Sequence, residues 1–305
     1  MKMVIRADDA GYSHVHNLAT FETVDHGLTT SVDLMLDTPG AVEAMEFLRR
    51  RPWISVGWHP HFWGTSVLPH SEVPSMIDKK RGHFRQDLAT AADFDKDECL
   101  AELRAQLALC REHLGRVPDT ILIMAPEGIF RSALEQACDE AGVVRDYLYA
   151  RPLSGAGRSS ASDGYLPPAG PWKDKKIYVT NLDRDSDMLR CLKSDSLREQ
   201  FRYDPMDLWE KDVAGLSRLP EDCTAIVVLH PGYVDHYVYK EGDQSPHGLG
   251  FMAIRVVDTQ VLCSQRLHDW LLAHRIELVN QRDALYGGND YQLHLRAINS
   301  DLALL

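Results

Sequence analysis

The sequence predicts an α/β protein whose parallel strands curl into a distorted barrel. Short apolar runs typical of strands alternate with helical runs along the chain, which indicates a mostly parallel sheet. Roughly eight such strands in one chain favour a barrel over an open sheet. Polar residues collect just after the strand-like runs, where α/β folds place their functional sites.

The first half of the chain repeats this alternation clearly. Residues 100–114 form the strongest predicted helix, because one apolar face persists for about four turns. The predicted helix at residues 134–138 should stop at Gly142, because glycine is common just after the C-terminus of a helix. Strands are expected at residues 3–7, 29–36, 53–58 and 120–125, and helices at residues 18–28, 42–47, 100–114 and 134–138.

Further strands are expected at residues 177–180, 225–229 and 276–279, with a helix over residues 262–271 before the last. Residues 62–94 and 151–174 break the rhythm and are predicted to be long loops, which in compact domains are usually functional lids or disordered. Neither an internal repeat nor a clean boundary divides the chain. We therefore expect residues 1–305 to form a single domain.

Composition excludes several classes of protein. The chain of 305 residues has 44% hydrophobic and 26% charged residues, the balance of an ordinary globular protein. Its net charge of −12 disfavours nucleic acid or an anionic membrane as a partner, because both need a basic face. No apolar run reaches the ~18 residues of a membrane span.

The compartment is predicted from the thiols and the N-terminus. The 6 cysteines form no Cys-x-x-Cys pair, and several lie in apolar stripes, so we expect buried free thiols. Charged residues follow the first methionine too soon for a signal peptide. Both observations predict a cytoplasmic protein.

Asp8 and Asp9 end the first predicted strand. Adjacent strand residues point to opposite faces, but both carboxylates can face one cavity where the backbone turns at a strand end. One carboxylate of such a pair can hold a metal while the other takes a proton. Alternatively, one of them caps the following helix.

His59-Pro60-His61 follows another predicted strand. In an extended segment, residues two apart share a face, so both imidazoles could reach one cation. His230 ends the apolar run 225–229 and is a candidate general acid, because histidine is the residue type that most readily exchanges a proton near neutral pH; the alternative is a core histidine bonded to a carbonyl. We expect the following histidines on the surface: His14, His16, His236, His247 and His294.

Five segments follow one another in a recognisable order: Ala7-Asp8-Asp9-Ala10-Gly11, Thr30-Ser31, Gly57-Trp58-His59, the loop from Leu68-Pro69 to Asp78, and His230-Pro231. In this order they resemble the motifs of the YdjC/ChbG family of carbohydrate deacetylases, over most of residues 1–285.

The resemblance implies a distorted TIM-like barrel and a divalent metal ion, Zn²⁺ or Mg²⁺, that activates water against the N-acetyl group of a small amino sugar. By the same resemblance, Asp9 and His59 are metal ligands and Asp8 is the base. His230 protonates the leaving amine or stabilises the oxyanion. Amide hydrolysis needs an activated water and a stabilised oxyanion, and one cation can supply both.

One position departs from the family. Its third ligand is a histidine in an Asp-Ser-His stretch, and the matching position here holds Met124. A thioether is a poor ligand for Zn²⁺, Mg²⁺ or Mn²⁺. By spacing, His61 is the first candidate to replace it and Glu127 the second.

The sequence therefore predicts a cytoplasmic, metal-dependent deacetylase that acts on small carbohydrates, with a homodimer as one oligomeric state. Two alternatives stay open. One is a sugar-binding barrel that has lost its metal and its activity, as Met124 would allow. The other is a different metal-dependent barrel enzyme that uses His59 and His61 as amidohydrolases use their His-x-His.

Overall fold

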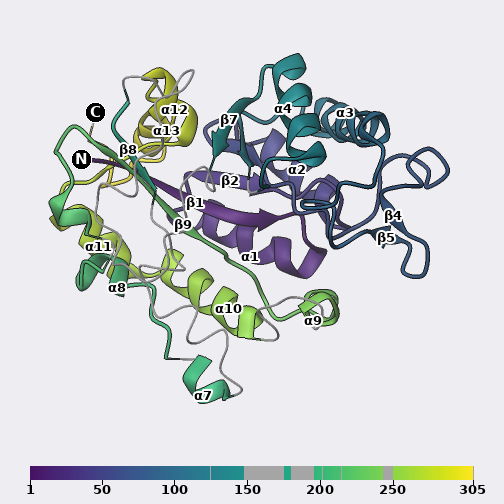
Figure 1. Ribbon diagram of the computed structural model, residues 1–305. Helices are drawn as coiled ribbons and strands as arrows, with labels where there is room; N and C mark the ends of the chain where they lie inside the picture. Colours follow the sequence, from purple (N-terminus) through teal and green to yellow (C-terminus); the bar gives the residue numbers. More distant parts are fainter. Residues whose placement is uncertain are drawn as a thin grey trace.

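A computed structural model describes residues 1–123, 125–147, 175–179, 196–200, 202–213, 215–242 and 250–304 (Figure 1). Its main sheet has eight strands, and every pairing within it is parallel. The order is β7-β6-β3-β2-β1-β9-β8, with β10 paired to the start of β1. The strands are β1 (Lys2–Ala10), β2 (Ser31–Leu34), β3 (Ser55–Trp58), β6 (Thr120–Ile123), β7 (Val144–Tyr147), β8 (Ile177–Val179), β9 (Thr224–Leu229) and β10 (Glu277–Leu278).

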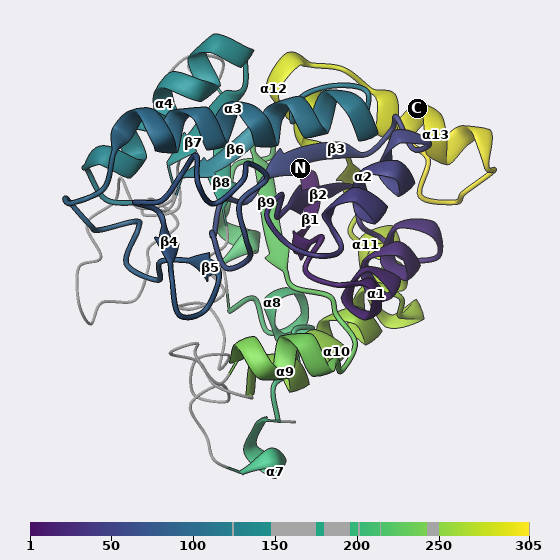
Figure 2. The same ribbon diagram turned by 90° about the vertical axis from the view of Figure 1, so that its right-hand side faces the viewer.

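Helices surround this sheet, with α3 beside α4 and α1 beside α10 (Figures 1 and 2). The prediction of a distorted α/β barrel is confirmed, with β7 and β8 at the edges among the described strands. The helices are α1 (His14–Asp25), α2 (Ala41–Arg49), α3 (Lys96–His113), α4 (Ile129–Ala141), α7 (Leu197–Gln200), α8 (Asp207–Glu210), α9 (His236–Gly242), α10 (Gly250–Leu262), α11 (Gln265–Ala273), α12 (Gln281–Tyr286) and α13 (Asp290–Ala297), with a 3₁₀ turn, η3 (Leu216–Arg218).

Element boundaries differ from the sequence-based expectations in a few places. The helix expected over residues 262–271 is divided between α10 and α11, because Ser264 caps the N-terminus of α11 by accepting a hydrogen bond from the Leu267 N–H. The loop over residues 62–94 contains a two-stranded antiparallel ribbon, β4 (Ile77–Asp78) and β5 (His83–Phe84). The loop expected at 151–174 lies outside the described residues.

The sheet places the carboxyl ends of several strands at one edge. β1 lies between β2 and β9, and residues 3–10 of β1 are buried. The register pairs Ala7 with Val32 of β2 and with Leu229 of β9. Residues directly after these strands therefore lie side by side. They form the carboxyl-terminal edge of the sheet, where the candidate site was expected.

Two smaller predictions concern the thiols and the membrane. Among the described cysteines, Cys99, Cys110, Cys138 and Cys223 are buried free thiols, as expected, and Cys263 is half-buried. No helix in the described part of the chain combines the length and apolar character that a bilayer span needs.

Candidate metal-binding site at the carboxyl ends of the strands

A bulge at the end of β1 turns two consecutive carboxylates toward the same side. The register of β1 against β2 shifts between Ala7 and Ala10, and Asp9 has a positive φ of 65°. Aspartate tolerates this left-handed conformation better than most residues. The bulge breaks the alternation of side chains between the two faces of the strand, so Asp8 and Asp9 both contact His59.

His59 and His61 meet through a tight turn rather than an extended segment. The His59 N–H continues the parallel ladder by donating to the Leu34 carbonyl, at 2.7 Å. The His61 N–H then donates to the His59 carbonyl at 3.0 Å, which closes a three-residue turn. The prediction that both imidazoles share a side is confirmed, but the predicted reason, an extended backbone, is wrong.

These side chains form a compact group around Asp9. The Oδ1 atom of Asp9 lies 3.3 Å from His61 Nε2 and 3.5 Å from His59 Nε2. The two Nε2 atoms are themselves in contact. Each of the three residues offers one ligand atom within 4.8 Å of the others, so the group could hold a metal ion.

Arg255 of α10 fixes the opposite side of the Asp9 carboxylate. Its Nη2 donates to Asp9 Oδ2 at 2.5 Å, and both side chains are 1% exposed. Asp9 Oδ1 is buried and lies nearest to the two imidazoles. The arginine thus occupies one carboxylate oxygen and leaves the other directed at the two imidazoles.

His16 lies beneath this pair, so the expectation that it lies on the surface is wrong. It is fully buried, and its Nε2 is 3.0 Å from Arg255 Nη1. Because an arginine can only donate, His16 Nε2 accepts and the ring carries its proton on Nδ1. Burial, reinforced by Arg255, holds the pKa of His16 well below its usual value, so the ring is neutral.

Asp8 is enclosed by different partners. Arg6 donates from Nε to Asp8 Oδ1 at 2.9 Å and from Nη2 to Oδ2 at 3.4 Å. The same Oδ2 lies 3.5 Å from His59 Nδ1. His59 is therefore held between two carboxylates, with Asp9 at Nε2 and Asp8 at Nδ1.

Burial and neighbouring charges set the ionisation of these groups. Burial alone would raise the pKa of Asp9, but Arg255, His61 and His59 together hold it well below its usual value. Burial, together with repulsion from His61, lowers the pKa of His59 to about 3. At neutral pH the site therefore combines an ionised carboxylate with a neutral imidazole, the forms that bind metals.

His230 directly follows β9, at the level of Asp8 on the neighbouring strand. Its N–H donates to Asp258 Oδ2 of α10 at 2.7 Å. Gly232 then passes so close to His16 that a Cβ atom would lie 2.7 Å from the ring, which explains the small residue in this loop. His230 belongs to neither group of potential metal ligands among the described residues.

Aromatic side chains line the site next to His61. Trp63 stacks on the His61 ring with centroids 4.0 Å apart. Tyr12 meets both Trp63 and Tyr237 edge to face, each at 5.7 Å. These rings come from the segments after β3 and β1 and from α9, so they form one wall beside the imidazoles. Such a wall could stack on a sugar ring.

Sequence reasoning missed Arg255, Asp258 and Thr259. They lie at positions i, i+3 and i+4 of α10, so they share one face of a largely apolar helix. Thr259 Oγ1 accepts a hydrogen bond from the Gly232 N–H at 3.0 Å. The signal in the sequence that could have identified these residues is the presence of charged residues within an apolar helical stripe. It was not used, because the part of α10 before residue 262 was not predicted.

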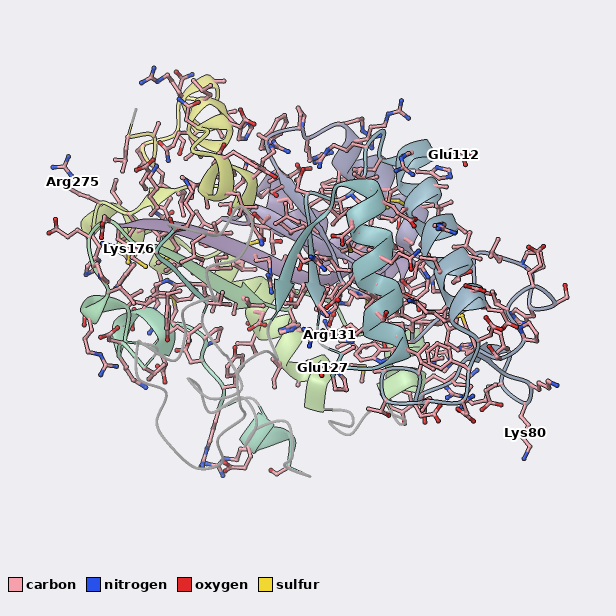
Figure 3. All side chains as sticks on the ribbon, turned by 45° about the horizontal axis from the view of Figure 1, so that its top comes forward. Lys80, Glu112, Glu127, Arg131, Lys176 and Arg275 are labelled. Atoms are coloured by element: carbon pink, nitrogen blue, oxygen red, sulfur yellow. The ribbon has the colours of Figure 1, made fainter. Side chains whose placement is uncertain are left out.

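The two candidate replacements for the missing family ligand differ in position. His61 lies in the group with Asp9 and His59. Glu127 is exposed in the segment before α4, near Arg131 (Figure 3), and belongs to neither potential metal-binding group. Met124 lies outside the described residues.

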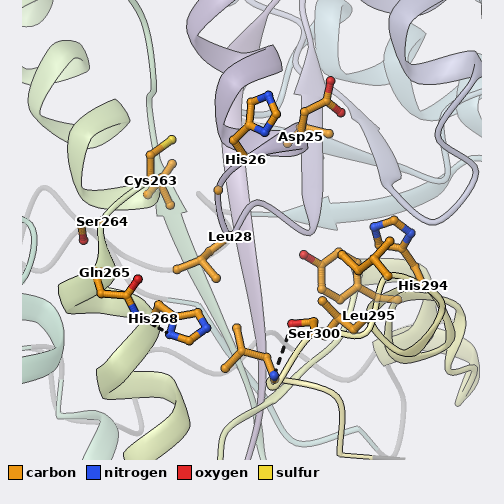
Figure 4. A pocket seen from close by; sticks show the side chains of 16 residues that line it. Asp25, His26, Leu28, Cys263, Ser264, Gln265, His268, His294, Leu295 and Ser300 are labelled. Atoms are coloured by element: carbon orange, nitrogen blue, oxygen red, sulfur yellow. Dashed lines mark hydrogen bonds between the residues drawn. The ribbon is translucent and has the colours of Figure 1, made fainter.

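A pocket of about 240 Å³ lies at the opposite, amino-terminal end of the strands (Figure 4). It is lined by the end of α1, the α10–α11 junction and α13, with His26, His268 and His294 around it. The described residues there form no group of potential metal ligands. The buried charges are concentrated at the carboxyl ends instead.

Fold and site together define an α/β-barrel protein with a buried imidazole–carboxylate centre at the carboxyl ends of its strands. The family model for YdjC-like proteins matches residues 2–273. The chain belongs to this family, and the resemblance seen in its sequence is confirmed.

Curated relatives agree with this assignment, and a solved structure agrees with the fold. The chain is 25% identical over 284 residues to a carbohydrate deacetylase of Brevibacillus brevis, covering 92% of this chain and 98% of the relative. It is 21% identical to carbohydrate deacetylase 2 of Listeria innocua, with coverages of 93% and 98%. A crystal structure from Enterococcus faecalis, described as a cellobiose-phosphate cleavage protein, is similar with a TM-score of 0.60 at 19% identity, covering 93% and 98% of the two chains.

Proposed function

We propose that this protein is a metal-dependent carbohydrate deacetylase that removes acetyl groups from N-acetylated amino sugars or small oligosaccharides. The names of its full-length relatives support the deacetylase activity. The observation that carries the metal dependence is the group of Asp9, His59 and His61, with the buried Asp9 Oδ1 directed at both imidazoles.

The residues present fit a divalent cation. Two imidazole nitrogens in contact repel each other unless a proton or a cation lies between them, and Asp9 adds a buried negative charge. Two nitrogen ligands and one carboxylate match the three protein ligands of catalytic zinc sites, whereas Mg²⁺ prefers oxygen ligands throughout. We therefore assign Asp9, His59 and His61 as ligands and favour Zn²⁺ over Mg²⁺.

The remaining side chains supply the proton transfers. A divalent ion bound by these ligands would activate a water molecule and polarise the acetyl carbonyl. Asp8 would be the base in this reaction, and Arg6, which donates to it at 2.9 Å, holds its carboxylate in place. His230, which directly follows the adjacent strand β9 at the level of Asp8, donates a proton to the leaving amine.

Substitutions test this division of roles. Asp9→Asn and His59→Ala should each abolish metal retention, because each removes a ligand, while Asp8→Asn should retain the ion and lose turnover. Elemental analysis after dialysis measures retention, and acetate release from N-acetylated amino sugars with added Zn²⁺, Mn²⁺, Mg²⁺ or Co²⁺ measures turnover. Loss of the metal in Asp8→Asn, as complete as in Asp9→Asn, would contradict the assignment.

The same measurements decide against the alternatives. A wild-type protein that binds N-acetylated sugars but retains no metal and releases no acetate would be a sugar-binding barrel. Metal binding with no acetate release from any acetylated sugar would indicate a different metal-dependent hydrolase.

We further propose a cytoplasmic homodimer that acts on small carbohydrates without a nucleic acid or membrane partner.

A further inference from the structure

A second buried cluster lies directly behind the proposed metal ligands. Asp8, Asp33 and His59 each offer a ligand atom within 4.8 Å of the others, and all three side chains are buried. Arg6 lies among them and is itself 1% exposed. Its Nε donates to Asp8 at 2.9 Å and lies 3.6 Å from Asp33 Oδ2. The cluster thus consists of two carboxylates and one imidazole, with the guanidinium cation of Arg6 already among them.

The chain makes room for this arrangement at one glycine. The β2–β3 register places Asp33 opposite Gly57, two residues before His59. A Cβ atom at Gly57 would lie 2.1 Å from Asp33 Oδ1, so any other residue there would displace the carboxylate. Gly57 of β3 therefore leaves room for the carboxylate of Asp33 on β2, which lies 3.6 Å from Arg6 Nε of β1.

Two buried carboxylates this close to one another need a positive charge between them. A divalent ion commonly supplies it, and hydrolytic sites with two metal ions recur in proteins. An arginine supplies a permanent charge in a fixed planar geometry that suits carboxylates. Arg6 contacts both carboxyl groups, so the position of a second ion is filled by the protein.

We propose that Arg6 is a built-in cation that takes the place of a second metal ion between Asp8 and Asp33. This inference rests on the proposed function, since the first ion is the one assigned to Asp9, His59 and His61. It makes the centre mononuclear. It also gives Arg6 and Asp33 a positioning role, because Arg6 donates to Asp8 at 2.9 Å, lies 3.6 Å from Asp33, and so holds in place the carboxylate proposed as the base.

The experiment counts metal ions in proteins loaded with Zn²⁺ and then titrated with Mn²⁺. Elemental analysis and the electron paramagnetic resonance of bound Mn²⁺ measure the stoichiometry, and neither requires activity. Wild type should bind one ion per chain. Arg6→Ala and Arg6→Gln should bind a second ion, as Mn²⁺, because Asp8 and Asp33 then offer oxygen ligands that suit a hard cation.

Matched variants separate this effect from general damage. The double variant R6A/D33N should return to one ion, because the second site loses a carboxylate. Arg6→Lys should also bind one, because it keeps a cation. Arg116→Ala removes another partly buried arginine, which pairs with Asp119 at 3.0 Å away from the site, and should bind one ion as wild type does.

Stability gives a second readout if Arg6→Ala folds poorly. Mn²⁺ should then raise its thermal midpoint by several degrees more than it raises that of R6A/D33N, because an ion that binds only the folded state stabilises it. Arg6→Gln, which keeps an amide donor, provides the deciding stoichiometry. One ion per chain in folded Arg6→Gln would overturn the proposal. No ion in wild type with one in Arg6→Gln would support it while refuting the proposed metal site.

Discussion

Both ends of the parallel strands carry histidines, but the surroundings of these histidines differ. At the carboxyl ends, His59 is 2% exposed and lies between Asp8 and Asp9, with two buried arginines beyond them. At the amino-terminal pocket, His268 pairs with Asp301, whose side chain is 61% exposed. His294 there stacks on Trp53 at 4.0 Å.

The two ends differ in the burial of charge rather than in the number of histidines, and the buried charge is at the end proposed to be functional. Burying an ion is costly, so a buried cluster of charges persists only where each member has a compensating partner. Burial lowers the pKa of His59 to about 3, while His26 at the amino-terminal pocket is solvent-exposed. His268 and His294 are half-buried, and burial also lowers the pKa of His294, but His26 is exposed and Asp301, the partner of His268, is exposed as well.

Removal of a buried arginine should have the largest effect on folding. We expect Arg255→Met to lower the free energy of unfolding by about 3–5 kcal/mol, because it leaves Asp9 buried without a counter-charge. Arg266→Met removes an exposed arginine of α11 that pairs with Asp204 at 2.9 Å, and should cost about 0–1 kcal/mol. Urea unfolding of the metal-free proteins measures both values. Equal losses in the two variants would show that the buried cluster is not special.

Much of this carboxyl-end cluster follows from the sequence, but its supporting residues do not. Asp8, Asp9, His59 and His230 stand directly after strand-like runs, and parallel strands bring their carboxyl ends to one edge. The bulge at Asp9 is not visible in the alternation of residues, since it depends on the register against β2.

Long-range partners are the part that sequence patterns leave out. Arg255 contacts Asp9 from 246 positions away, and no local periodicity encodes that pairing. His16 has polar neighbours in the sequence, so the expectation of a surface residue was reasonable, but α1 turns it inward against Arg255. Arg6 lies within a buried strand, where a charged residue needs a partner, and the sequence-based prediction did not use this signal.

Stability near the carboxyl ends should also depend on pH through Asp258. Burial raises the pKa of Asp258 to about 6, above its ordinary 3.8, so the folded state favours the neutral acid. The contribution of neutral Asp258 to the free energy of unfolding is complete below about pH 4 and is lost as the pH rises through 6. The difference between a pKa of 3.8 in the unfolded chain and about 6 in the folded protein corresponds to about 3 kcal/mol.

Asp258→Asn tests this dependence, because an asparagine keeps an oxygen that can accept the His230 N–H and cannot ionise. Relative to wild type, the variant should gain free energy of unfolding as the pH rises from 4 to 7. Asp269→Asn is the matched change on α11, where the carboxylate is exposed and its pKa is lowered by a hydrogen bond from Gln265. If the two variants show the same trend between pH 4 and 7, the burial of Asp258 is not its cause.

The smallest effect is expected at the amino-terminal pocket. His268→Ala removes the contact of His268 Nε2 with Asp301 Oδ1 at 2.9 Å, but water and salt screen this pair because the aspartate is exposed. The loss of unfolding free energy should therefore stay below about 1 kcal/mol. Metal affinity, measured by calorimetry with Zn²⁺, should equal that of wild type, because His268 belongs to no group of potential ligands in the described part of the chain. His59→Ala, measured beside it, removes an imidazole of the opposite end and should bind no Zn²⁺. A loss of affinity in His268→Ala comparable to that in His59→Ala would mean that both ends of the strands contribute to metal binding, and the contrast between them would fail.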